Sequence, residues 1–277
     1  MVRRDFSIII TGIVVPVFLF FAAGCGKNAK EMTPVEKIKN YTKALEENPN
    51  DVIMLNNRAG AYYENGQYFE AIQDYSKALE LNPDVIDFYI NRGLAYLRNQ
   101  QYDRAVLDYT NAIRLDPENS TAHYNLGDLY YMTGLYEEAV VEYTHAIESD
   151  PTHINSYSNR GLSYKNLGEF ELAIADYTRA IELNPSVALY YNNRGNSLVA
   201  VQRYEEAVQD FNKALELEPD LALAYSGRGF AYEEMGMLKK AINDFRAFIQ
   251  HSPDKESIFV IQAEAKITAL EVKLREK

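Results

Sequence analysis

The chain is poor in the residues on which many enzymes and nucleic-acid binders rely. Its 277 residues include one cysteine, which excludes an internal disulfide and a cysteine-rich zinc site. Lysine and arginine total 28 against 40 aspartates and glutamates, giving a formal net charge of −12. An acidic chain repels phosphate, which argues against general nucleic-acid binding. With 47% hydrophobic and 25% charged residues, the composition is still that of a folded protein.

Motifs for catalysis and metal binding are also scarce. Neither a P-loop nor a nucleophile elbow occurs in the sequence. The four histidines have no metal-ligand spacing, and they are His123, His145, His153 and His251. The sequence therefore predicts a protein that is not an enzyme and that uses no metal or cofactor.

The one long apolar run lies at the N-terminus. Arg3 and Arg4 precede a nearly uninterrupted apolar stretch from Phe6 to Ala23, and small residues lead from it into Cys25. This order is typical of a secretory signal peptide. The Ala-Ala-Gly-Cys sequence also resembles a bacterial lipobox, although such motifs usually carry leucine where this chain has alanine. The resemblance implies that residues 1–24 are removed and that Cys25 carries a diacylglycerol and palmitate-like acyl chains.

Two other interpretations of this segment remain open. The run of about 18 apolar residues is long enough to stay in a bilayer as an uncleaved anchor. The segment could also be a plain signal peptide, in which case Cys25 carries no lipid. The lipidated form would lie in the bacterial cell envelope, anchored to a membrane and facing outside the cytoplasm, with residues 25–32 as a tether.

A 34-residue period runs through the rest of the chain. Proline recurs at this interval at Pro49, Pro83, Pro117, Pro151, Pro185, Pro219 and Pro253. Proline forces the preceding residue out of helical geometry, so each of these prolines is expected to end a helix. A fixed period of 34 residues is the signature of tetratricopeptide (TPR) repeats.

Six complete units follow when each proline is numbered as position 32. They span residues 52–85, 86–119, 120–153, 154–187, 188–221 and 222–255. Position 20 is always alanine, position 8 is glycine in all but the first unit, and position 24 is tyrosine or phenylalanine. The pattern resembles the TPR family in its Asn-Arg-Gly subtype, as in Asn91-Arg92-Gly93, and the whole chain resembles bacterial TPR lipoproteins. The resemblance implies an all-α, right-handed α-solenoid of helical hairpins.

Both ends of the repeat array differ from the complete units. Residues 33–51 form a half repeat that begins with a capping box, in which Thr33 is the cap, Pro34 the first helical residue and Glu36 the third. Residues 256–276 carry an apolar stripe at helical spacing, made of Phe259, Ala263, Ile267, Leu270 and Leu274. We expect this segment to be a capping helix that closes a solenoid spanning residues 33–277, with fourteen helices and no strands.

Asparagine recurs at position 6 of five units. These residues are Asn57, Asn91, Asn125, Asn159 and Asn193. An asparagine side chain offers both a donor and an acceptor, which match the two groups of an extended peptide backbone. Some TPR superhelices use such a ladder on their concave face, and the resemblance implies that this chain does so too. The alternative is that each amide bonds a neighbouring helix within the protein.

Arginine at position 7 and aspartate at position 23 occur together in five units. The pairs are Arg58 and Asp74, Arg92 and Asp108, Arg160 and Asp176, Arg194 and Asp210, and Arg228 and Asp244. Position 7 is expected to face the helix packing, where a charge needs a partner. We predict a structural ion pair within each unit, with separations below about 4 Å.

The leading functional hypothesis is a membrane-tethered TPR adaptor that binds a protein or extended peptide in its concave groove during envelope assembly or complex formation. An alternative is a small-ligand-binding or transport-accessory lipoprotein with a pocket inside the superhelix. An apolar, closed pocket would favour the alternative, and an open groove lined by asparagines favours the adaptor. A cluster of convergent histidines and acids would instead point to a hydrolytic enzyme.

Overall fold

A computed structural model describes residues 32–276, which fold into fourteen α-helices and no strands. The predicted signal, Cys25 and all of the predicted tether but Met32 lie outside the described residues. The helices are α1 (Pro34–Glu47), α2 (Val52–Glu64), α3 (Tyr68–Leu81), α4 (Ile86–Arg98), α5 (Tyr102–Leu115), α6 (Ser120–Met132), α7 (Tyr136–Ser149), α8 (Ile154–Leu167), α9 (Phe170–Leu183), α10 (Ala188–Ala200), α11 (Tyr204–Leu217), α12 (Ala222–Glu234), α13 (Leu238–His251) and α14 (Ile258–Arg275).

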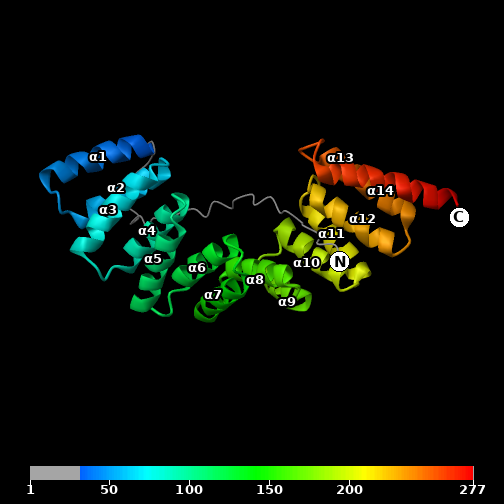
Figure 1. Ribbon diagram of the computed structural model, residues 1–277, viewed down its shortest axis with the longest axis horizontal. Helices are drawn as coiled ribbons and strands as arrows, with labels where there is room; N and C mark the ends of the chain where they lie inside the picture. Colours follow the sequence, from blue (N-terminus) through cyan, green and yellow to red (C-terminus); the bar gives the residue numbers. More distant parts are fainter. Residues whose placement is uncertain (1–31, 277) are drawn as a thin grey trace.

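The predicted all-α solenoid is confirmed. Each complete unit is a hairpin of two helices, and the second helix of each hairpin packs against the first helix of the next one. The chain therefore forms a linear stack in which each hairpin contacts its neighbours, as Figure 1 shows for α2 to α13.

The first helices of the units line the inner side of the stack. Helices α2, α4, α6, α8, α10 and α12 each contact the next helix of this set, whereas no two of the second helices, α3 to α13, contact each other. Because the first helices are crowded together and the second helices are spread apart, the stack bends into an arc. Figure 1 shows this arc, with α6, α8 and α10 on its concave edge and α7 and α9 on its convex edge.

Glycine at position 8 lets the two helices of a hairpin approach closely. A Cβ atom at Gly93 would lie 2.6 Å from Cε1 of Tyr109, and one at Gly127 would lie 2.9 Å from the ring of Tyr143. Tyr109 and Tyr143 are fully buried. The aromatic ring at position 24 thus occupies the space that a side chain at position 8 would need.

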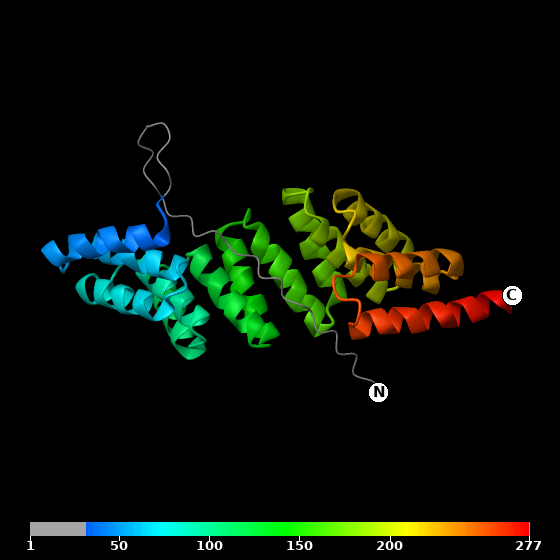
Figure 2. The same cartoon turned by 90° about the horizontal axis from the view of Figure 1, so that it is seen from above.

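Both ends of the array fold as the sequence predicts for a solenoid. The Thr33 side chain and the Glu36 side chain form a reciprocal capping box at the start of α1. Helix α14 lies along α13 (Figure 2) and buries Val260, Ala263 and Leu270 against it. Within residues 32–276, none of the helices is both long and apolar enough to cross a membrane.

Candidate functional site: the concave groove

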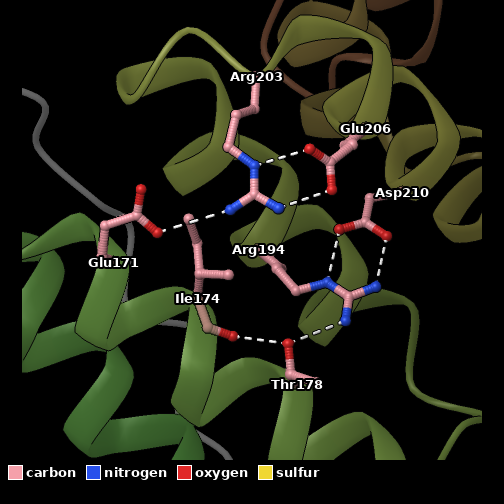
Figure 3. A network of polar contacts seen from close by, with 7 residues as sticks. All are labelled: Glu171, Ile174, Thr178, Arg194, Arg203, Glu206 and Asp210. Carbon is pink, nitrogen blue, oxygen red and sulfur yellow. Dashed lines mark hydrogen bonds and ion pairs between the residues drawn. The ribbon is translucent and has the colours of Figure 1, made fainter.

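The position 7 arginines form forked ion pairs within their own units. In each pair the arginine Nε and Nη2 donate to the two carboxylate oxygens of the aspartate sixteen residues later, at 2.6–2.8 Å. All five predicted pairs are present in the structure. Figure 3 shows the pair of Arg194 and Asp210. The hydrogen bonds from Arg194 to Asp210 raise the pKa of Arg194 above its usual value, although burial opposes this shift.

The same arginines also connect each unit to the preceding one. The Nη1 atom of Arg194 donates to the Thr178 hydroxyl at 3.0 Å, and that hydroxyl donates to the Ile174 carbonyl at 2.7 Å (Figure 3). Equivalent bonds reach Thr42, Ser76, Thr144 and Asn212 from the other four arginines. This contact is not among those predicted from the sequence, although Ser, Thr or Asn stands at position 25 of the half unit and of the first five complete units. The ladder of arginines is therefore a structural device on the packing face.

In the third unit a histidine takes the place of the Arg–Asp ion pair. Leu126 stands at position 7, and the ring of His123 contacts Glu142 Oε2 at 2.7 Å and the Pro117 carbonyl at 3.0 Å. Both partners are acceptors, so both ring nitrogens donate only when the imidazole is protonated. Burial lowers the pKa of His123, but the bonds to Glu142 and Pro117 outweigh it, and the pKa is raised above its usual value.

The predicted asparagine ladder divides into three kinds of environment. Asn57 and Asn193 each accept a long hydrogen bond from the preceding asparagine of their own helix, at 3.5 and 3.3 Å. Asn159 donates to Asp128 Oδ1 at 2.8 Å and to the Tyr124 hydroxyl at 3.3 Å. Asn91 and Asn125 are half-buried and make no side-chain hydrogen bond with any described residue. The interpretation of a bond within the protein therefore holds for Asn159, whereas Asn91 and Asn125 have no such bond among the described residues.

Asp128 determines the environment of Asn159. It lies at position 9 of the third unit, and its Oδ1 also accepts a hydrogen bond from the Tyr143 hydroxyl at 2.6 Å. Burial raises the pKa of Asp128, while the donors from Tyr143 and Asn159 oppose that shift. This contact shows that the hydroxyl of the tyrosine at position 24 reaches position 9 of its own unit, beneath the groove.

The groove contains a pocket between the first two units. Its volume is about 20 Å³, which is room for about one water molecule, and its lining residues are Asn56, Gly60, Tyr63, Glu64, Tyr75, Asn91 and Leu94. These residues come from α2, α3 and α4. The lining residues thus include two carboxamides, two phenols and a carboxylate, but most of the exposed lining is apolar.

Within residues 32–276, no three histidine, cysteine, aspartate or glutamate side chains converge to hold a metal ion. His123 and His145 have ring centroids 5.1 Å apart, and Glu142 bonds His123. That cluster takes the place of the Arg–Asp pair of the other units.

Several TPR family models match the chain. A tetratricopeptide repeat model matches residues 90–154, and a TPR repeat model matches residues 59–100 and 195–236. Three further tetratricopeptide repeat models match residues 154–187, 40–73 and 224–255. No curated protein matches the chain.

Solved TPR structures are similar to the chain over most of its length. YrrB, described as a TPR protein with an unusual peptide-binding site, is 25% identical, with a TM-score of 0.61 over 69% of this chain and 97% of YrrB. MamA is 25% identical, with a TM-score of 0.58 over 60% of this chain and 91% of MamA. The C-terminal part of a TPR repeat-containing protein from Cytophaga hutchinsonii is 19% identical, with a TM-score of 0.69. That alignment covers 83% of this chain and 94% of the Cytophaga chain. The chain belongs to the tetratricopeptide repeat family.

Proposed function

We propose that the chain is a membrane-tethered TPR adaptor that binds a protein or an extended peptide in its concave groove. The observation that carries this proposal is the environment of Asn91 and Asn125, whose half-buried amides have no partner among the described residues. Neither amide is among the buried polar atoms without a partner, so both are open to solvent on the inner helices α4 and α6 and are available to an external partner. The proposed mode of action is binding, without catalysis.

The repeat geometry supports an extended peptide as that partner. Asn91 and Asn125 occupy the same position of adjacent units, so their amides are presented in the same way along the groove. Each can donate to a backbone carbonyl and accept from a backbone N–H without contacting the side chains of the peptide. YrrB, which is described as having a peptide-binding site, has the same fold.

The proposed tether comes from the N-terminal sequence. Seven residues lie between Cys25 and the cap residue Thr33, and the eight extended steps along the chain that join them reach about 26–29 Å. A lipid on Cys25 would hold the groove close to a membrane of the bacterial cell envelope, where a partner in envelope assembly or in a protein complex would meet it. The proposed relationship to bacterial TPR lipoproteins rests on two features, the Asn-Arg-Gly repeats and this N-terminal sequence.

The N-terminus of the purified protein tests the tether. Mass spectrometry is expected to find a chain that begins at Cys25 and carries the added mass of a diacylglycerol and an acyl group. An unmodified Cys25, or an intact Met1, would contradict the lipoprotein proposal.

Crosslinking in the native cell followed by mass spectrometry tests the groove. Changing Asn91 and Asn125 together to alanine is expected to abolish recovery of the partner. Asn243→Ala is the matched control, because Asn243 is exposed on α13, one of the helices of the convex side. Recovery that the double change leaves intact would argue against the adaptor function.

The small-ligand alternative receives less support from the structure. The pocket in the groove has a volume of about 20 Å³. Small-molecule sites are clefts of about 300–1,000 Å³ that enclose most of the ligand. The pocket is therefore too small to enclose a solute of that kind.

A further inference from the structure

The two ends of the array are complementary halves of one hairpin. Helix α1 is a second helix, because Arg58 of α2 donates to its Thr42 at 3.3 Å, as the other position 7 arginines do to the second helix before them. Helix α14 packs on α13 as a first helix does. Within the described residues the solenoid thus opens with a second helix that lacks its first helix and closes with a first helix that lacks its second.

An apolar stripe of α14 faces solvent. The first helices of the six complete units all begin at position 1, so Ile258, where α14 begins, is numbered as its position 1. On this numbering Ile261, Ala265, Thr268 and Val272 hold positions 4, 8, 11 and 15. Ile261 is 52% exposed and Val272 is 49% exposed, and Ala265 and Thr268 are exposed as well. The stripe is separate from the face that α14 buries against α13.

In the complete units these positions face the second helix of the same hairpin. Position 8 lies against the ring at position 24, as Gly93 does against Tyr109. Position 11 lies beside position 19, since Arg104 lies over the ring of Tyr96 at 5.6 Å from its centroid. Leu55, at position 4 of the first unit, is 1% exposed. The stripe on α14 is therefore the surface that a second helix covers elsewhere in the chain.

The matching face of α1 is also incompletely covered. Tyr41 and Ala44 stand at positions 24 and 27 of the half unit and are half-buried. Their counterparts in the first complete unit, Tyr75 and Ala78, are 4% and 0% exposed. Because the helices of a hairpin are antiparallel, one turn before position 8 lies opposite one turn after position 24, so position 4 meets position 27. A first helix with a small residue at position 8 would cover both Tyr41 and Ala44.

Two exceptions to the repeat pattern match each other across these faces. Among the described helices, α14 is the only first helix with an acid, Glu264, at position 7, where five units have arginine. Likewise, α1 is the only second helix without an acid at position 23, where it has Asn40. Lys37 and Lys43 lie one turn to either side of Asn40. Glu264 would meet an acid on any other second helix but an amide between two lysines on α1, so charge selects α1.

The sizes of two opposing side chains are exchanged in the same way. In the complete units position 20 is alanine, and position 11 opposite it is tyrosine or leucine. Helix α1 carries the larger Lys37 at position 20, and α14 carries the smaller Thr268 at position 11. The stem of Lys37 thus fits the space that the missing ring leaves. Its ammonium lies 2.8 Å from Glu64 of α2, so the charge has a partner at the edge of this face.

We propose that α1 of a second copy of this chain packs on the exposed stripe of α14 and completes a seventh hairpin between two molecules. The contact places Tyr41 beside Ala265 and Ala44 beside Ile261. In one molecule α1 and α14 lie at opposite ends of the arc (Figure 1), so the contact joins different molecules head to tail. It leaves the inner face of the first helices free, and the inference is therefore independent of the proposed peptide binding.

Cysteine crosslinking in the native cell tests the contact. Two full-length copies with different tags are expressed together, one with Ala265→Cys and one with Ala44→Cys, and are treated with a short bismaleimide. A crosslinked species that carries both tags is expected. Ala175→Cys is the matched control for Ala44→Cys, because Ala175 is exposed on α9, on the convex side. Each variant expressed with the wild type measures any crosslinking through Cys25.

A charge exchange between the two copies tests the selection of α1. Adding Glu264→Arg to the Ala265→Cys copy is expected to lower the crosslink yield about fivefold, because the new cation faces Lys37 and Lys43. Adding Asn40→Asp to the Ala44→Cys copy then rebuilds the Arg–Asp pair of the complete units and is expected to restore the yield. Glu264 and Asn40 are both exposed, and the thermal midpoint by circular dichroism checks that each variant folds.

Three results would overturn the proposal. A yield with Ala175→Cys equal to that with Ala44→Cys would mean that the copies meet without this contact. A yield that folded Glu264→Arg leaves unchanged would mean that α1 does not pack against position 7 of α14. Crosslinking only between two Ala265→Cys copies would show that α14 pairs with another α14 instead of α1.

Discussion

Arg92 and Asp108 form a forked ion pair in which Nη2 lies 2.7 Å from Oδ1 and Nε lies 2.8 Å from Oδ2. The aspartate side chain is 2% exposed and the arginine side chain is 18% exposed. Arg92 Nη1 also donates to Ser76 of the preceding unit at 3.1 Å. The pair therefore connects the two helices of one hairpin, and Arg92 also connects that hairpin to the preceding one.

Removing the carboxylate of this pair is expected to destabilise the solenoid strongly. Asp108→Ala leaves the arginine charge without its partner in a largely buried site, which costs about 3 kcal/mol of unfolding free energy. Urea unfolding followed by circular dichroism measures the change. Glu206→Ala is the control, because Glu206 pairs with Arg203 at 2.6 Å on the surface, where both side chains are 41–53% exposed. A loss for Asp108→Ala as small as that of the control would contradict the structural role.

Substitution by alanine is expected to change the unfolding free energy in opposite directions at two glycines of the inner helices, Gly93 and Gly60. Gly93→Ala places a Cβ atom 2.6 Å from the Tyr109 ring and should destabilise the protein by about 1–3 kcal/mol. Gly60→Ala meets its nearest atom at 3.7 Å and should stabilise helix α2 by about 0.5–1 kcal/mol, because alanine loses less conformational entropy than glycine. Thermal unfolding of the two variants compares them directly, and a change of equal sign would refute the packing argument.

The seam between the second and third units is expected to weaken as pH rises. Burial lowers the pKa of His123, but the bonds to Glu142 and the Pro117 carbonyl leave it raised overall, with Asp116 adding to the shift. A histidine with a raised folded pKa stabilises the protein fully below its unfolded value of about 6.5, and this stabilisation is lost as pH rises through the folded pKa.

Installing the residues of the other units should remove that pH dependence. The variant carrying His123→Tyr, Leu126→Arg and Glu142→Asp restores the residues found at these positions in the second and fourth units. The unfolding free energies of the wild type and this variant are compared from pH 5.5 to 8.5. The wild type is expected to lose stability relative to the variant as pH increases. His153 has a pKa lowered by burial, which acts in the opposite direction, but it is present in both proteins and cancels in the difference. Parallel curves would show that His123 does not titrate in this range.

The architecture could be predicted because the same packing pattern recurs in every repeat. Proline every 34 residues fixes the helix ends, and the glycine at position 8 faces the ring at position 24 in five units. The Arg–Asp spacing is the same in five units, so a single geometric argument places all of these pairs.

The behaviour of individual groove residues could not be predicted in this way. Asn159 has a protein partner because position 9 of the preceding unit is Asp128, whereas the unit before Asn125 carries Leu94 there, and Asn125 has no partner among the described residues. The contact of Asn159 joins residues 31 positions apart on different helices, so it emerges only from packing. The pocket likewise depends on one departure from the repeat, Gly60, whose consequence is visible only once Tyr75 is placed beneath it.

Binding of a library-selected peptide to the purified protein, measured by isothermal titration calorimetry, tests the central claim most directly. The double change of Asn91 and Asn125 to alanine is expected to weaken binding at least about tenfold, because each amide contributes roughly 1 kcal/mol through its hydrogen bonds. Asn243→Ala on the convex side is expected to leave the affinity unchanged. Equal affinity of the wild type and the double variant would contradict a groove in which these asparagines hold the peptide.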